Sequence, residues 1–132
     1  MTDPFGLLRD AKTIAIVGAS PSPDRESHGV MRYLLNQGYR CIPVRPDCDD
    51  VLGIRCVPTL LEIDEPIDLV DVFRRPEFCA AHAHEAVTVG AKALWLQLGI
   101  VSPEARAIAE AAGLGYVENA CTAVVHARGL RA

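Results

Sequence analysis

The chain has 132 residues, of which 50% are hydrophobic and 23% charged, a composition that suffices for one packed core. We therefore expect a single domain over residues 1–132. The formal net charge of −4 excludes the broad basic surface needed for sequence-independent binding to nucleic acid or anionic membranes. No apolar run reaches the roughly 20 residues that span a bilayer, and "MTDPFGLLRD" lacks the pattern of a signal peptide. We expect a cytoplasmic protein with neither nucleic acid nor membrane as partner.

The cysteines and histidines do not predict a metal site or a disulfide framework. The cysteines are odd in number and form no C-x-x-C pair; they are Cys41, Cys48, Cys56, Cys79 and Cys121. His82 and His84 are two residues apart, which on a helix places them on nearly opposite faces. We expect free thiols and no bound metal.

Four segments read as buried strands, and a fifth is weaker. Their apolar residues are largely continuous, as a parallel sheet covered on both faces requires. In chain order they are 13–19, 40–44, 67–73, 92–98 and the weaker 115–119.

Helical patterns with recognisable ends separate these strands. The first covers 27–37, with Ser27 as its N-cap and Gly38 as its stop. The second covers 76–89 and begins with a proline; the third begins at Pro103 after the cap Ser102. The alternation predicts a doubly wound, three-layer α/β sandwich around a mainly parallel five-stranded sheet.

The carboxyl ends of parallel strands meet at one edge of a sheet, where ligands bind. The windows after the first four predicted strands carry four arginines in an acidic chain: Arg25, Arg45, Arg74 and Arg75. After the first strand, Gly18 permits a close approach of the backbone, and the turn "GASPSPDRES" supplies hydroxyls ahead of a helix N-terminus. Singly, each residue has an ordinary structural explanation; together they favour a phosphate-bearing ligand.

The spacing of residues in this loop limits the classes of ligand that it is expected to bind. It lacks the G-x-G-x-x-G pattern of nicotinamide and flavin sites. Where such sites place an acid for the ribose hydroxyls, the chain has Arg45-Pro46, which suits a ribose carrying a phosphate, as in NADP or coenzyme A. Asp47 lies close by in the sequence and leaves the acidic alternative open.

Several spaced motifs resemble one family. The stretch "TIAIVGASPSPDRESHGVMRYLLNQGYRCIPVRP", then "DLVDVFRRPE", "GAKALWLQLGI" and a Cys-containing segment ending in His resemble the small, stand-alone CoA-binding proteins. Their domain is similar to the N-terminal domain of the succinyl-CoA synthetase α subunit. The resemblance covers about residues 12–128 and implies a Rossmann-like domain that holds coenzyme A.

The resemblance also implies the ligand-binding residues. They are Gly18, Ala19, Ser20, Ser22, Arg25 and Ser27 in the phosphate loop, Arg45 and Pro46 after the second strand, Val72, Phe73, Arg74 and Arg75 at the third, and Gln97 at the fourth. Family members more often carry Asn at the position of Arg45. Basic residues are also common where this chain has Ala120 and Ala123. Either Arg45 compensates for those charges, or the affinity for CoA is lower.

Without room for the catalytic domains of the related ligases, the chain is expected to bind CoA or an acyl-CoA without catalytic residues of its own. Cys121 and His126 offer an alternative, a thiol activated by imidazole, although a core cysteine and a structural histidine are commoner. Asp71, inside an apolar strand, must lie at the solvent end or bond backbone N–H groups of a loop.

Two other functions remain open: an NADP-linked oxidoreductase on the same scaffold, and a CoA-binding subunit of an acyl-CoA ligase-type complex. A homo-oligomer or a partner subunit is compatible with either.

Overall fold

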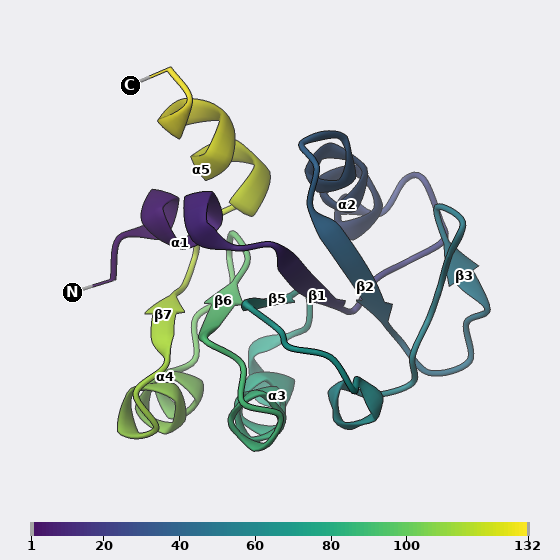
Figure 1. Ribbon diagram of the computed structural model, residues 1–132. Coiled ribbons are helices and arrows are strands. Elements are labelled where there is room, and N and C mark those ends of the chain that lie inside the picture. The colour runs from purple at the N-terminus through teal and green to yellow at the C-terminus, as the bar shows by residue number, and fades with distance from the viewer. Residues whose placement is uncertain (1, 132) are drawn as a thin grey trace.

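The computed structural model describes residues 2–131, which form a central five-stranded sheet with helices on both faces (Figure 1). All neighbouring strands are parallel, and their order is β2-β1-β5-β6-β7. The strands are β1 (Thr13–Val17), β2 (Arg40–Val44), β5 (Leu69–Val72), β6 (Ala93–Leu96) and β7 (Gly115–Val117). The predicted fold class is confirmed. Of the five predicted strands, only 40–44 has the observed bounds, because the ends of the others belong to the loops that follow or precede the sheet.

The helices form the outer two layers (Figure 1). On one face lie α1 (Pro4–Asp10), α2 (Glu26–Asn36) and α5 (Thr122–Gly129). On the other lie α3 (Pro76–Thr88), α4 (Pro103–Ala111) and the short 3-10 helix η1 (Leu60–Glu62). Within residues 2–131, none of these helices has the length and apolar character to cross a membrane.

The core has two clusters, one on each face of the sheet, because the side chains of each strand point alternately to the two faces. In β1, Ala15 and Val17 pack in the cluster that contains α3 and α4, whereas Ile14 and Ile16 pack in the cluster that contains α2. Side chains of successive strand residues point to opposite faces, so a continuous apolar run fills both clusters at once. The unbroken apolar strands of the sequence follow from this arrangement.

One of the two predicted capping serines is confirmed. Ser102 accepts a hydrogen bond from the Ala105 backbone N–H at 3.1 Å and begins α4. The prediction for Ser27 is wrong, because α2 begins at Glu26 and its N-cap is Arg25, whose side chain makes no capping bond. Ser27 is therefore a residue of the first helical turn and lies buried against the rest of the protein.

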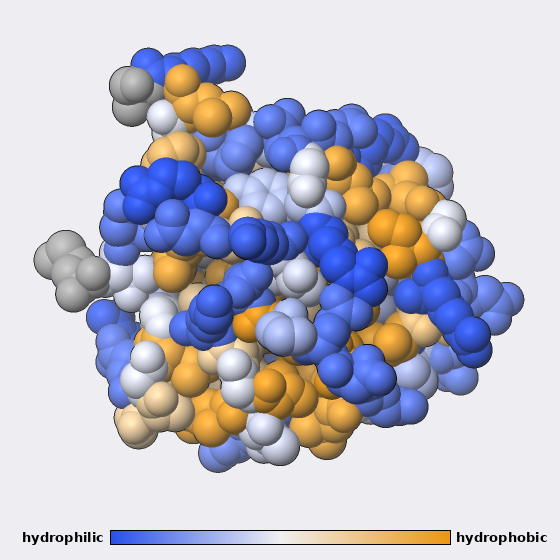
Figure 2. Space-filling model, in the orientation of Figure 1, coloured by the Kyte–Doolittle hydropathy of each residue, from blue (hydrophilic) through white to orange (hydrophobic). Residues whose placement is uncertain are grey.

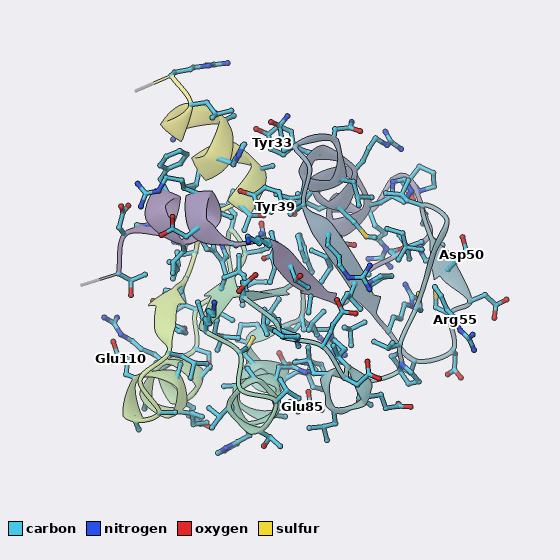
Figure 3. The ribbon with its side chains drawn as sticks, in the orientation of Figure 1. Tyr33, Tyr39, Asp50, Arg55, Glu85 and Glu110 are labelled. Atoms are coloured by element: carbon cyan, nitrogen blue, oxygen red, sulfur yellow. The ribbon has the colours of Figure 1, made fainter. Side chains whose placement is uncertain are left out.

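Four small elements had no sequence prediction: α1, η1, α5 and a hairpin of β3 (Asp50–Val51) and β4 (Ile54–Arg55). Two-residue strands are too short for a periodic pattern. Figure 3 shows Asp50 and Arg55 on this hairpin, beyond the outer edge of the sheet. The hairpin returns along β2, where Arg45 N–H donates to the Val57 carbonyl at 2.9 Å, and so fixes the segment that follows β2.

Candidate functional site

A cavity of about 780 Å³ lies at the carboxyl edge of the sheet, within the size range of small-molecule sites. The loops after β1, β2, β5 and β6 line it, as the topology requires for strands that run in parallel. Eleven of the residues that the sequence analysis selected line this cavity: Gly18, Ala19, Ser20, Arg25, Ser27, Arg45, Pro46, Phe73, Arg74, Arg75 and Gln97. The structure thus brings together residues that are up to 79 positions apart.

Gly18 allows the phosphate loop to pass directly over β5. Its φ is +83°, and a Cβ atom at this position would lie 2.5 Å from the Phe73 carbonyl oxygen. The Gly18 N–H donates to the Val44 carbonyl at 3.1 Å, and the Phe73 N–H donates to the Val17 carbonyl at 2.8 Å. A side chain here would have to displace the backbone of the β5–α3 connection. Only glycine fits both the conformation and the space.

The loop after Gly18 leads into the N-terminus of α2. Ser20 and Ser27 are 5% and 4% exposed, and the Ser20 hydroxyl oxygen accepts from the Ser22 N–H at 3.1 Å. The first N–H groups of a helix have no partner within it, and the helix dipole places partial positive charge there. The loop and the first turn of α2 therefore form a cradle suited to an anion.

The charge around the cavity has the opposite sign to that of the whole chain. Four arginines line it, namely Arg25, Arg45, Arg74 and Arg75, against two acids, Glu26 and Asp47. The local balance is therefore +2, while the chain carries −4. A positively charged cavity attracts negatively charged ligands. This excess favours a polyanion.

Three of the arginines are held by neighbours. Arg45 Nη1 donates to the Ala19 carbonyl at 3.3 Å, which draws the guanidinium toward the phosphate loop. The guanidinium of Arg74 lies 4.5 Å from the Phe78 ring centroid, and that of Arg75 lies 5.4 Å from the same centroid. Stacking on an aromatic ring fixes a guanidinium plane and leaves its N–H groups available.

Two of the selected residues do not line the cavity. Val72 is fully buried in the cluster on the α3 side, because alternation along β5 turns it away from the face that carries Asp71 and Phe73. Its side chain has no access to a ligand. Ser22 donates its hydroxyl to Asp24 within the turn and lies outside the cavity lining. Neither side chain therefore belongs to the cavity lining.

Asp71 also differs from expectation, because it is fully buried and its partners are side chains. Gln97 Nε2 donates to Asp71 Oδ1 at 2.7 Å, and the Thr122 hydroxyl donates to Asp71 Oδ2 at 3.0 Å. Burial raises the pKa of Asp71 to about 7, the two hydrogen bonds oppose the shift, and the charge of Glu26 adds to it. The carboxyl lies neither at the solvent end of the strand nor against backbone N–H groups.

Cys121 and His126 make no hydrogen bond to each other among residues 2–131 and have different surroundings. Cys121 is the N-cap residue of α5, and its carbonyl accepts from the Val125 N–H. His126 Nδ1 lies 2.8 Å from the Tyr33 hydroxyl, and its ring packs edge-on against Tyr33 and Tyr39. Figure 3 shows both tyrosines beside α5. The imidazole therefore joins α5 to the α2 layer, and neither residue lines the cavity.

The cavity has further lining residues that sequence reasoning did not select as ligand contacts: Glu26, Val44, Asp47, Pro76, Leu98, Gly99 and Ile100. Each lies within three residues of a predicted contact. Four of them lie inside the segments considered after the strands, and a wider window would have added Val44, Asp47 and Ile100. Thr122 was missed because its partners, Asp71 and Gln97, are 51 and 25 positions away. No local pattern carries that information.

The face of the molecule drawn in Figure 2 has mixed hydropathy. In Figure 2, hydrophilic residues run across the visible face and apolar residues form separate groups, the larger of them over the lower part, where α3 and α4 lie. Among residues 2–131 there is no group of three or more His, Cys, Asp and Glu side chains placed to hold a metal ion. The polar side chains that line the cavity are those of the arginines, Ser20, Ser27, Glu26, Asp47 and Gln97.

Comparison with known families places the chain in one of them. A model described as "CoA binding domain" matches residues 12–127. The chain belongs to this CoA-binding domain family. Among curated proteins, it is 41% identical over 121 residues to an uncharacterised protein, YneT, of Bacillus subtilis, which covers 92% of this chain and 90% of that protein.

Solved structures of proteins of about the same length are also similar to this CoA-binding domain. A hypothetical protein from Pyrococcus horikoshii superposes with a TM-score of 0.94 at 41% identity, over 97% of this chain and 90% of that one. A protein from Thermus thermophilus superposes with a TM-score of 0.88 at 40% identity, over 93% of each chain. The shared Rossmann-like fold extends over nine-tenths or more of each solved chain.

The CoA-binding domain is also related to part of a larger enzyme. An ADP-forming acetate–CoA ligase of Methanocaldococcus jannaschii is 31% identical over 58 residues, which are 44% of this chain but 8% of the ligase. The relationship therefore concerns one segment of the ligase.

Proposed function

We propose that this chain binds coenzyme A, or an acyl-CoA, in the cavity at the carboxyl edge of the sheet. The observation that carries the proposal is the cavity's charge: four arginines gather around the phosphate loop of an otherwise acidic chain. Coenzyme A carries a pyrophosphate and a 3′-phosphate, which such a cavity can neutralise. Membership of the CoA-binding domain family supports the same ligand.

In this proposal the phosphates occupy two neighbouring positions. The pyrophosphate lies on the loop from Gly18 to Ser20 and on the N-terminus of α2, where N–H groups point outward. The 3′-phosphate lies against Arg45, which follows the adjacent strand β2 and leans toward Ala19. Arg74 and Arg75, stacked on Phe78, cover the phosphates from the side of β5. Pro46 and Phe73 complete the wall.

We further propose that the chain performs no catalysis alone. The lining has arginines, serines and two acids, and neither Cys121 nor His126 belongs to it. The similarity to a segment of an acetate–CoA ligase favours a second candidate, in which the chain supplies CoA to a partner that carries the chemistry. Purification of a tagged chain from its native cells tests this: a stoichiometric ligase-type subunit supports it, and its absence refutes it.

Calorimetric titration tests the binding proposal itself. The expected result is saturable binding of CoA, weaker binding of dephospho-CoA because Arg45 loses its phosphate, and weakest binding of NADP. No heat with CoA at about 1 mM would refute the proposal. Tighter binding of NADP than of CoA would favour an oxidoreductase instead. Equal binding of CoA and dephospho-CoA would remove the role assigned to Arg45.

A further inference from the structure

Beneath the cavity lies a buried polar triad formed by Asp71, Gln97 and Thr122. Besides the two bonds to Asp71, Gln97 Nε2 donates to Thr122 Oγ1 at 2.9 Å. The exposed fractions are 0% for Asp71 and Thr122 and 1% for Gln97. The residues come from three elements: β5, the end of β6 and the first turn of α5. Such a network in the interior is strong only when every member is satisfied.

One atom of the triad is not satisfied. Gln97 Oε1 is the single buried side-chain N or O atom within residues 2–131 that has no hydrogen-bond partner. Gln97 also lines the cavity, while its Nε2 is turned into the triad. A buried acceptor without a donor destabilises the free protein, so its presence in a native structure calls for a functional or solvent partner.

The orientation of this amide follows from its partners. Above its pKa, the Asp71 carboxylate only accepts hydrogen bonds, so it must face the Nε2 side of Gln97, and the affinities below are compared at pH 8. The Thr122 hydroxyl gives its proton to Asp71 and hence accepts the second N–H of Gln97. Reversal of the amide would place Oε1 against the carboxylate, oxygen against oxygen. Asp71 and Thr122 therefore fix Oε1 as the group that remains for a ligand.

We propose that Asp71 and Thr122 are positioning residues that hold Gln97 Oε1 as an acceptor for an amide N–H of the pantetheine arm of coenzyme A. This assignment rests on the proposed function and adds to it the part of the ligand that Gln97 recognises. A carbonyl oxygen repels phosphate, so the group that Gln97 meets must be a donor. The amide N–H groups of pantetheine are donors without charge.

The position of Gln97 across the sheet separates it from the phosphates. Arg45 follows β2, the phosphate loop follows β1, and Gln97 follows β6, two strands beyond β1 on the other side. Neighbouring strands lie about 4.8 Å apart, so β6 is roughly 10 Å from β1. A ligand whose phosphates occupy β1 and β2 must extend its other end toward β6. In coenzyme A that end is pantetheine, whereas the adenosine lies on the side of Arg45.

The test compares the affinities of two ligands for the wild type and for one variant, Asp71→Asn. Asp71→Asn introduces an amide that can donate to Gln97 Oε1, so the Gln97 amide is expected to reverse and to present N–H groups to the cavity. CoA affinity should then fall about tenfold, the effect of one net hydrogen bond. Affinity for adenosine 3′,5′-bisphosphate, which lacks pantetheine, should stay unchanged. Asp68→Asn makes the same exchange at a carboxyl outside the cavity lining and the triad, and serves as the matched control, with wild-type affinity for both ligands.

A second variant keeps the test decisive if Asp71→Asn fails to fold. Gln97→Met removes the acceptor and should lower the affinity for CoA while sparing that for the bisphosphate. An equal loss for both ligands would overturn the assignment, since the acceptor would then meet adenosine or act only through the fold. Unchanged CoA affinity in both folded variants would also overturn it. If neither ligand binds the wild type, the proposed function itself fails.

Discussion

Replacement of Asp71 by Asn is predicted to change how the stability of the protein depends on pH. The carboxyl is fully buried, and burial is the main reason why its pKa rises from the ordinary 3.8 to about 7. The native state therefore keeps a proton that the unfolded chain releases near pH 4. As the pH rises from 4 to 7, the free energy of unfolding falls, and above 7 the loss is complete.

The size of this loss follows from the shift in pKa. A change from 3.8 to about 7 corresponds to about 4 kcal/mol at pH 8, and to about 2–3 kcal/mol between pH 5 and pH 8. Asn is neutral throughout and can occupy the same space. The variant should therefore be more stable than the wild type at pH 8, and the difference should shrink toward pH 5.

Urea unfolding of both proteins at several pH values measures the difference directly. Asp68→Asn is a control for which the change in stability at pH 8 should have the opposite sign. Burial alone would raise the pKa of Asp68, but the N–H groups of Thr13 and Lys12 and the charge of Lys92 lower it overall. Asp68 therefore stabilises the fold above pH 4, and its loss should destabilise at pH 8. Parallel pH profiles for Asp71→Asn and the wild type would refute the reasoning.

Three further substitutions test the cavity and its frame. Gly18→Ala should lower the free energy of unfolding by about 3 kcal/mol in urea, because a Cβ would meet the Phe73 carbonyl at 2.5 Å and φ is +83°; a loss below about 1 kcal/mol would contradict the close packing. Arg45→Ala should weaken CoA about 10-fold or more in calorimetry but leave dephospho-CoA unchanged, since it removes a charge-assisted bond; equal weakening of both ligands would speak against the 3′-phosphate. Ser102→Ala should cost about 1 kcal/mol of unfolding free energy through the lost cap of α4 and leave CoA affinity intact, and a change in affinity would be the unexpected outcome.

Much of the fold could be predicted because its signals are local. A buried parallel strand is a continuous apolar run, and Pro103 after Ser102 marks a helix start within two residues. The position of the site followed from topology, since carboxyl ends of parallel strands share one edge. The loops after β1, β2, β5 and β6 accordingly meet around one cavity.

The direction of single side chains was harder to predict. An unbroken apolar strand does not reveal which residues face which layer, and the structure places the Val72 side chain in the core and not in the cavity lining. The same alternation places Asp71 on the opposite face, against Thr122 from a helix near the C-terminus. A hydrogen bond across 51 positions has no signature in either local segment. Such contacts require the structure.

The most direct test of the account is a crystal structure of the protein grown with coenzyme A. We expect the pyrophosphate on the loop Gly18–Ser20 at the N-terminus of α2, and the 3′-phosphate at Arg45. We further expect a pantetheine amide nitrogen within hydrogen-bond distance of Gln97 Oε1. Coenzyme A bound at another surface, or a cavity left empty at saturating ligand, would contradict the central claim.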